Sequence, residues 1–111
     1  MKRILFLLLL TLALLPSCHK KEKVQQPEPL LTEQQMVDIM TDSYLIEAIL
    51  NQRRSVGKDV SVYQRTYYDQ LFEHYGITDS IFDANIYYYS NELGALERIM
   101  DSVMNRFVKA Q

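Results

Sequence analysis

Three side chains in this sequence could take part in covalent or acid–base chemistry: Cys18, Glu47 and His74. Cys18 is the only cysteine of the chain, and a thiolate is the strongest nucleophile among the ordinary side chains. A carboxylate such as Glu47 and an imidazole such as His74 are the groups that most often act as general acids and bases. What each of the three can do depends on the segment that holds it.

Cys18 follows an N-terminal segment with the layout of a secretion signal. Lys2 and Arg3 precede a run of 12 residues, Ile4 to Leu15, that is apolar apart from one threonine. A transmembrane helix needs about 20 apolar residues, so this run is too short to span a bilayer. We therefore expect residues 1–17 to be a signal peptide that is removed.

The stretch Leu15–Cys18, with the sequence Leu-Pro-Ser-Cys, resembles a bacterial lipobox. In lipoproteins with that motif the thiol receives a diacylglycerol, the signal is cut before the cysteine, and the new N-terminus is acylated, for example with palmitate. An unmodified Cys18 is the alternative, but it would have no disulfide partner within the chain. Each buried methylene contributes about 0.8 kcal/mol, so three acyl chains hold a protein durably. Cys18 is the expected lipidation site.

Residues 18–31 are predicted to form a flexible tether. They are rich in lysine and glutamine and contain Pro27 and Pro29, a composition that buries little apolar surface. The lysines would also be attracted to anionic lipid head groups. Lys21 and Glu22 resemble half of the surface-export signal of Bacteroidota lipoproteins. The expected location is the cell envelope, most simply the outer membrane, facing either the periplasm or the cell surface.

Composition limits what the remaining chain can be. Without residues 1–17 there are 94 residues, in which 10 basic side chains face 14 acidic ones, for a net charge of −4. A negative balance argues against a nucleic-acid partner. A chain of this size can bury one core, so we expect a single domain over residues 32–111.

That domain is predicted to be all-α, a small bundle of about three to four helices, because its apolar residues recur at helical spacing. Thr32 and Gln35 have the spacing of a capping box, and Gly76 is placed to end a helix in the left-handed conformation. The pattern breaks or kinks near Ser90 and Asn91. The expected helices are 32–52, 60–75, a third that begins at Thr78, and a last one with an apolar seam of Leu93, Leu96, Met100, Val103 and Phe107.

Glu47 and His74 both fall within apolar helix faces. A carboxylate near the middle of such a face loses hydration and must find partners, which tyrosine hydroxyls or an arginine could supply. His74 lies near the C-terminal end of its helix, where the helix dipole favours a positive imidazole. The chain has no serine or cysteine nucleophile signature, no glycine-rich phosphate loop and no metal-ligand spacing. We expect structural roles for both residues, and no enzyme activity, cofactor or metal.

Tyrosines form a third group of candidates for a site. Successive residues of a helix point about 100° apart, so neighbouring tyrosines cannot all face one small core. Tyrosine suits protein interfaces because its large, stiff ring buries much area while its hydroxyl stays bonded. The alternative is that these rings cover the rim of the helical core. The candidates are Tyr67, Tyr68, Tyr87, Tyr88 and Tyr89.

Four stretches of the chain together carry a family resemblance: MVDIMTDSYLIEAIL (36–50), YYDQLFEHYGIT (67–78), FDANIYYY (82–89) and IMDSVM (99–104). They look like the Bacteroidota lipoproteins numbered 4296 among the domains of unknown function. A proline often stands in that family where this chain has Ser90 to Gly94, so the third and fourth helices could be one kinked helix. The resemblance implies a small helical domain on a lipoprotein and supplies no activity.

These observations predict a lipid-anchored envelope protein whose helical domain binds another envelope protein. One alternative is a chaperone-like domain that binds peptides through an exposed apolar groove. A less favoured alternative is an enzyme that uses Glu47 and His74, which would require a concave pocket holding both side chains.

Overall fold

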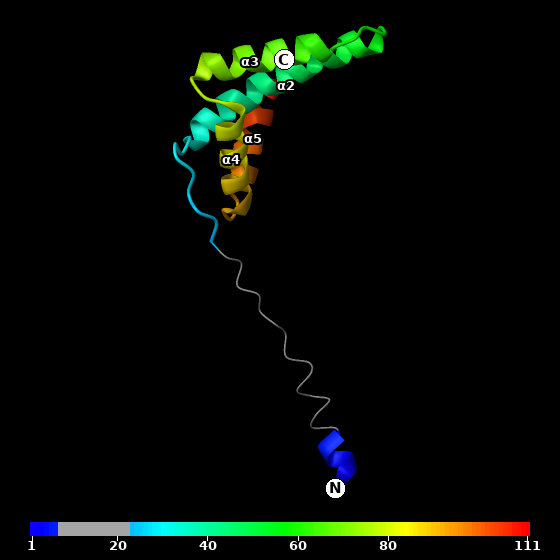
Figure 1. Cartoon of the computed structure of the whole chain (residues 1–111), viewed down its shortest axis with the longest axis vertical. Coiled ribbons are helices and arrows are strands. Elements are labelled where there is room, and N and C mark those ends of the chain that lie inside the picture. Colours follow the sequence, from blue (N-terminus) through cyan, green and yellow to red (C-terminus); the bar gives the residue numbers. More distant parts are fainter. Residues whose placement is uncertain (7–22) are drawn as a thin grey trace.

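The computed structural model describes residues 1–6 and 23–111, so Cys18 and the end of the expected signal peptide lie outside the described residues. All regular structure in the described part is helical, and the all-α prediction is confirmed. Residues 2–6 are helical, and four further helices follow (Figure 1): α2 (Glu33–Ser55), α3 (Ser61–Tyr75), α4 (Asp79–Asn91) and α5 (Ala95–Lys109). Within these ranges, every helix is too short or too polar to cross a membrane.

The helix ends follow from local chemistry and agree with the sequence. The Thr32 hydroxyl accepts from the backbone N–H of Gln35 at 3.1 Å, and the Gln35 side chain accepts from the backbone N–H of Thr32 at 2.8 Å, which completes the capping box. Gly76 ends α3 with φ of 65°, and the backbone N–H of Ile77 closes the last turn on the Phe72 carbonyl at 3.0 Å. Thr78 caps α4 through the N–H of Ile81.

The third and fourth helices are separate, and the predicted seam of the last helix is only partly buried. α4 ends at Asn91 and α5 begins after Gly94, whose φ of 72° turns the chain. Leu93 therefore lies in the turn and is fully exposed. The face that α5 buries carries Ala95, Ile99 and Val103, which recur every four residues. Val103 of the predicted seam belongs to this face, and Leu96, Met100 and Phe107 are half-buried.

The helices pack in two arrangements. α2 and α3 are antiparallel: the Tyr68 hydroxyl donates to Glu47, and the Tyr75 hydroxyl donates to Asp42, nearer the start of α2. α5 lies along the first half of α2 and runs in the same direction as α2. Two arginine–carboxylate pairs join the two helices there. These pairs are Arg98 with Glu33 at 2.6 Å and Arg106 with Asp38 at 2.5 Å.

The pair of α2 and α3 extends past the end of α5. Tyr44 is the last residue of α2 with an aromatic contact to α5, where its ring meets Phe107 edge-on at 6.3 Å. Beyond that point residues 45–55 and 60–67 form a two-helix arm, which projects from the rest of the domain (Figure 1). Leu50 and Val60 are buried within it. Leu45 and Ile49 are about half exposed because no third helix covers the arm.

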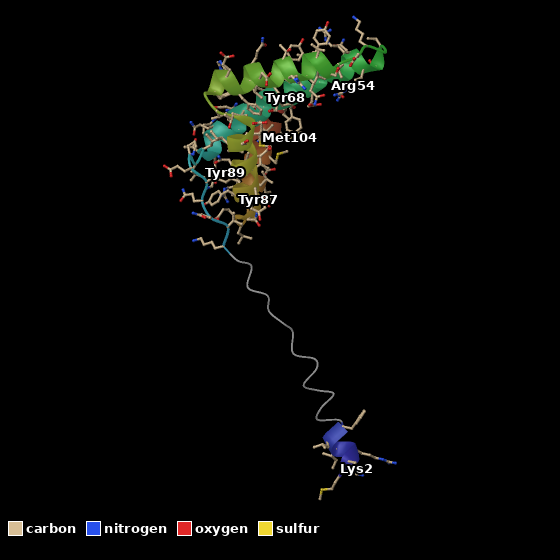
Figure 2. The ribbon with its side chains drawn as sticks, in the orientation of Figure 1. Lys2, Arg54, Tyr68, Tyr87, Tyr89 and Met104 are labelled. Carbon is tan, nitrogen blue, oxygen red and sulfur yellow. The ribbon has the colours of Figure 1, made fainter. Side chains whose placement is uncertain are left out.

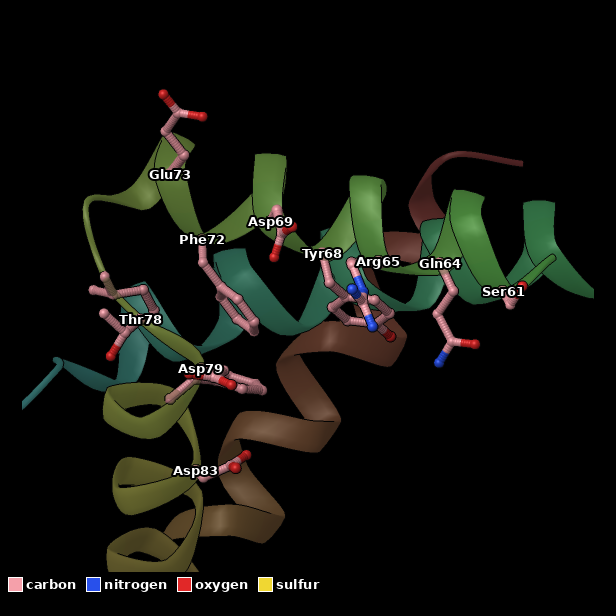
Figure 3. Close-up of a pocket in the computed structure, with 12 residues that line it drawn as sticks. Ser61, Gln64, Arg65, Tyr68, Asp69, Phe72, Glu73, Thr78, Asp79 and Asp83 are labelled. Atoms are coloured by element: carbon pink, nitrogen blue, oxygen red, sulfur yellow. The ribbon is translucent and has the colours of Figure 1, made fainter.

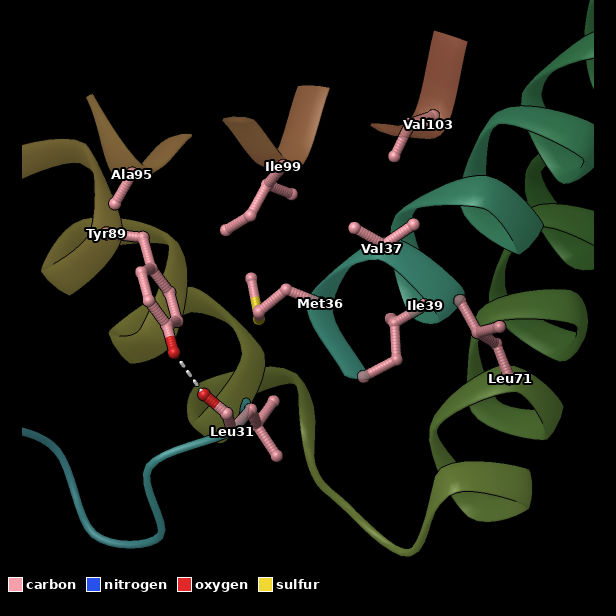
Figure 4. Close-up of a cluster of buried hydrophobic side chains, with 9 residues drawn as sticks. All are labelled: Leu31, Met36, Val37, Ile39, Leu71, Tyr89, Ala95, Ile99 and Val103. Carbon is pink, nitrogen blue, oxygen red and sulfur yellow. Dashed lines mark hydrogen bonds between the residues drawn. The ribbon is translucent and has the colours of Figure 1, made fainter. Parts of the chain in front are cut away.

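The core lies where α2, α4 and α5 meet, with α3 closing one side (Figure 4). Met36 and Ile39 of α2 are fully buried, as are Ile99 and Val103 of α5. Each such side chain contributes about 1.5–3 kcal/mol relative to an exposed position. The other members of the cluster are Leu31, Val37, Leu71, Tyr89 and Ala95.

The folded domain begins earlier than residue 32, because the end of the predicted tether is docked. Leu31 is only 5% exposed. The buried side chain of Asn85 accepts from the Leu31 N–H at 2.8 Å and donates to the Pro29 carbonyl at 3.1 Å and to the Ile81 carbonyl at 2.9 Å. The Tyr89 hydroxyl donates to the Leu31 carbonyl (Figure 4). We call this group of hydrogen bonds the Asn85 clasp.

The preceding residues also lie against the domain. Residues 23–27 line a shallow groove together with Ala84 and Tyr87 of α4. The described part of the predicted tether is therefore laid along α4 and then held by the Asn85 clasp.

Candidate functional site

Glu47 is less buried than its place in the helical pattern predicted. Its side chain is 39% exposed, because it lies in the two-helix arm, where no third helix covers it. It has both of the expected kinds of partner: the Tyr68 hydroxyl donates to one carboxylate oxygen at 2.7 Å, and Arg54 lies 3.7 Å from the other. Burial, together with the hydrogen bond to Glu47, raises the pKa of Tyr68 to about 12.

His74 is exposed, so its predicted place in the apolar face of the second helix is wrong. Its ring meets the Tyr75 ring edge-on, with the centroids 5.0 Å apart. Tyr75 is the residue that turns toward α2, where its hydroxyl donates to Asp42 at 2.6 Å. Burial and this hydrogen bond raise the pKa of Tyr75 to about 12. Neighbouring helix positions point about 100° apart, so His74 is directed away when Tyr75 faces inward.

The structure does not bring Glu47 and His74 together. Glu47 contacts α3 at Tyr68, six positions before His74, which corresponds to about 9 Å along a helix. In the described residues no hydrogen bond or ion pair joins the two side chains. Three open grooves in the described part of the chain are lined by neither Glu47 nor His74.

The tyrosines of α4 divide between the core and the surface. Tyr89 is buried, Tyr88 is half-buried against it, and Tyr87 is 61% exposed (Figure 2). The prediction that three consecutive tyrosines cannot all face one core is confirmed. On α3, Tyr67 is half-buried beside Tyr63, and Tyr68 is half-buried on the side of the helix that faces α4 and α2.

An open groove of about 830 Å³ lies in the angle between α3 and α4 (Figure 3). We call it the α3–α4 groove. The lining residues on α3 recur every three to four positions, so they form a single face of that helix. The lining residues on α4 come from its first turns. The lining residues are Ser61, Gln64, Arg65, Tyr68, Asp69, Phe72, Glu73, Ile77, Thr78, Asp79, Phe82 and Asp83.

Aromatic rings form the floor of the α3–α4 groove. Phe72 and Phe82 are half-buried, with ring centroids 5.6 Å apart, and they join α3 to α4. Tyr68 continues the row, 6.0 Å from Phe72, and its hydroxyl is held by Glu47. Glu47 does not line the groove, but its hydrogen bond with Tyr68 holds one of the rings of the floor in place.

The rim of the α3–α4 groove is acidic. Asp69 and Glu73 on α3, and Asp79 and Asp83 on α4, are exposed, and Arg65 is the one basic side chain among the lining residues. The described residues show no ion pair that involves any of these four carboxylates. In contrast, three acidic side chains of α2 are each paired with an arginine: Glu33, Asp38 and Glu47.

Sequence reasoning missed this groove, although part of its signal was present. The spacing of Gln64, Tyr68 and Phe72 places them on one face of α3, but the angle between α3 and α4 cannot be predicted from the sequence. Among the described residues, no group of three or more histidine, cysteine, aspartate or glutamate side chains is arranged to hold a metal ion.

Residues 27–111 match the family model described as a domain of unknown function, DUF4296. The chain belongs to this family. The match includes Pro29 and Leu31, so the family domain contains the residues held by the Asn85 clasp. The DUF4296 description names no activity. No curated protein matches the chain, and no solved structure does.

Proposed function

We propose that this DUF4296 protein is a lipid-anchored lipoprotein of the cell envelope, held in the outer membrane, and that its helical domain binds another envelope protein without catalysis. The anchor is Cys18, and the binding surface is the α3–α4 groove with the exposed tyrosine beside it. The proposed function is to hold this partner protein close to the membrane.

The anchoring part of the proposal is supported by the sequence around Cys18. The apolar run, the lipobox-like stretch Leu15–Cys18 and the absence of any second cysteine in the sequence all favour lipidation. Pro29, the first residue held by the Asn85 clasp, lies eleven residue steps after Cys18. A fully extended chain of that length spans at most about 40 Å. A partner must therefore come within roughly one domain diameter of the bilayer.

The α3–α4 groove is the observation that carries the binding part of the proposal. It is open and has an aromatic floor surrounded by charged side chains, whereas small-molecule sites enclose most of their ligand. An apolar centre with a polar rim is the arrangement of protein interfaces. Tyr87 lies one helical turn after Asp83, and its exposed ring extends the surface along α4. Tyrosine is among the residues enriched at the energetic centres of such interfaces.

The positions of Glu47 and His74 favour binding over catalysis. Glu47 is engaged by Tyr68 and Arg54, while His74 is exposed on another part of α3. The α3–α4 groove is lined by neither of the two.

Exposed apolar side chains favour a second candidate, a chaperone-like domain that binds many unfolded segments. They lie on α2 and α5 outside the α3–α4 groove, and the contact of Tyr44 with Phe107 links the two helices there. Apolar side chains in such positions mark interaction surfaces when they are contiguous. The residues are Tyr44, Leu45, Ile49, Met104 and Val108.

Crosslinking in intact cells, followed by affinity capture and mass spectrometry, tests the proposal. Gln64→Trp places a large ring in the α3–α4 groove without changing its charge. Gln70→Trp makes the same change at an exposed position of α3 outside the groove and is the matched control. We expect one stoichiometric envelope partner with the wild-type protein and with Gln70→Trp. The same partner should be lost with Gln64→Trp and reduced with Cys18→Ala.

Three other results would point elsewhere. Equal capture by Gln64→Trp and Gln70→Trp would show that the groove is not the binding surface. Capture of many unrelated proteins, insensitive to Gln64→Trp, would favour the chaperone-like candidate. If no protein is captured at all, the proposed binding function is wrong.

A further inference from the structure

We propose that the α3–α4 groove binds a positively charged segment of the partner protein that also carries apolar side chains. This inference rests on the proposed function and identifies the chemistry of the partner. It depends on three observations: the charge of the rim, the apolar floor, and the straight face that α3 presents.

The charge of the rim selects a cationic partner. Four carboxylates and one guanidinium line the groove, which leaves a net charge of −3. Asp69 and Glu73 are one helical turn apart on α3, and Asp79 and Asp83 are one turn apart on α4, so like charges are adjacent on both sides. Lysine or arginine side chains of a partner would relieve this repulsion. Nucleic acids and anionic lipid head groups would increase it.

The floor requires that the partner also bring apolar side chains. Phe72 and Phe82 are only half-buried in the isolated chain, although their rings are in contact. Aliphatic or aromatic side chains placed on them would remove this apolar surface from water, which is the main source of binding free energy at an interface. Because the Tyr68 hydroxyl is already bound to Glu47, its ring is held in place before binding.

The length of the groove sets the size of the segment. From Ser61 to Glu73 the lining of α3 extends over twelve residue steps, or about 18 Å. A helical segment of about twelve residues, or an extended one of about five or six, covers this distance. Arg65 lies toward the start of this face, and the four carboxylates lie toward its end and on α4. The positive charges of the bound segment are therefore expected near the corner where α3 meets α4.

Two synthetic peptides measure this preference directly. Both are twelve-residue amphipathic helices with leucine at the same positions, and they differ only in having lysine or glutamate at the polar positions. Their binding to the full chain carrying Cys18→Ala is followed by fluorescence anisotropy. We expect the lysine peptide to bind, with an affinity that falls as salt is added, and the glutamate peptide not to bind.

The rim is tested by a matched pair of charge reversals. Asp69→Lys/Glu73→Lys reverses two carboxylates one turn apart in the groove. Glu97→Lys/Asp101→Lys makes the same change, at the same spacing, on the exposed side of α5. We expect the groove variant to weaken binding of the lysine peptide by about tenfold or more, and the α5 variant to change it by less than about twofold. Circular dichroism establishes that both variants are folded.

The outcomes separate this inference from the proposed function. Equal weakening by the two double variants, or equal binding of the two peptides, would overturn the inference. If the cellular partner is still lost with Gln64→Trp in that case, the groove binds a protein of another chemistry and the proposed function stands. Loss of the lysine peptide in Gln64→Trp, with binding retained in Gln70→Trp, would further support the inference.

Discussion

Asn85 is the one fully buried polar side chain among the residues that the structure describes, and all of its hydrogen-bonding partners are backbone groups. In the sequence it is a polar residue between Ile81 and Tyr89 on an apolar helix face, but the sequence does not show which groups it bonds. Its role depends on a segment more than fifty residues earlier in the chain. That is why sequence reasoning assigned residues 29–31 to the tether.

Replacing Asn85 by alanine should lower the free energy of unfolding by about 1–3 kcal/mol, because the buried N–H of Leu31 loses its acceptor. Asn91→Ala, at an exposed position of the same helix, should change it by less than about 0.5 kcal/mol. Urea denaturation of the two variants measures the difference. Equal midpoints would mean that the Asn85 clasp does not stabilise the fold.

Tyr68 and Tyr75 predict a loss of stability at alkaline pH. Burial and a carboxylate partner raise the pKa of each from 10 to about 12 in the folded chain. The folded state holds these protons more tightly than the unfolded state does. The two tyrosines therefore contribute fully to the free energy of unfolding below pH 10, and this contribution is lost as the pH rises from 10 to 12. The free energy of unfolding should fall over this interval, and it should fall less in the variant Tyr68→Phe/Tyr75→Phe. A fall of equal size in both proteins would contradict this assignment.

At the scale of the helices, the left-handed conformation of Gly76 can be tested by substitution. Gly76→Ala should destabilise the protein by about 1–2 kcal/mol, because a Cβ is unfavourable at φ of 65°. Gly76→Asn should cost less, since asparagine tolerates this conformation. Thermal denaturation of both variants checks the order. If Gly76→Ala destabilises the protein no more than Gly76→Asn does, the left-handed backbone conformation is not the reason for a glycine at this position.

The helices themselves could be predicted because their signals are local. The Thr32 capping box, the Thr78 cap and the Gly76 stop each involve residues within five positions of one another. Which face of a helix is buried is decided by its neighbours instead. α5 buries Ala95 and Ile99 because it lies along the first half of α2, and His74 is exposed because Tyr75 reaches Asp42.

The candidate site was the least predictable part of the molecule. The exposed tyrosine among Tyr87, Tyr88 and Tyr89 could be anticipated from helix geometry alone, and so could a tyrosine or arginine partner for Glu47. The α3–α4 groove could not, because it depends on the angle set by the short connection at Ile77. The family match over residues 27–111 agrees with the resemblance seen in the sequence, and leaves the lipoprotein assignment as part of the proposal.

At the scale of the whole molecule, the proposed anchor predicts where the protein is found in a cell. Cys18→Ala should abolish incorporation of labelled fatty acid and leave the precursor uncleaved at this site. A tagged Cys18→Ala protein should no longer be found in the membrane fraction that contains the wild-type protein. Ser17→Ala keeps a small residue before the cysteine and should still be lipidated. Fractionation and mass spectrometry of the three proteins measure this. A wild-type protein that lacks acyl chains would rule out the anchor.

The Asn85 clasp also has a mechanical consequence if the chain is attached to a membrane as proposed. A pull on the N-terminus first reaches Pro29 and Leu31, whose backbone groups are bonded to Asn85 and Tyr89. The force therefore passes into the middle of α4, and the first turn of α2 bears tension only after these bonds have broken. In the proposed lipid-anchored form, tension from the membrane would thus load α4, which forms one wall of the α3–α4 groove, before it reaches α2.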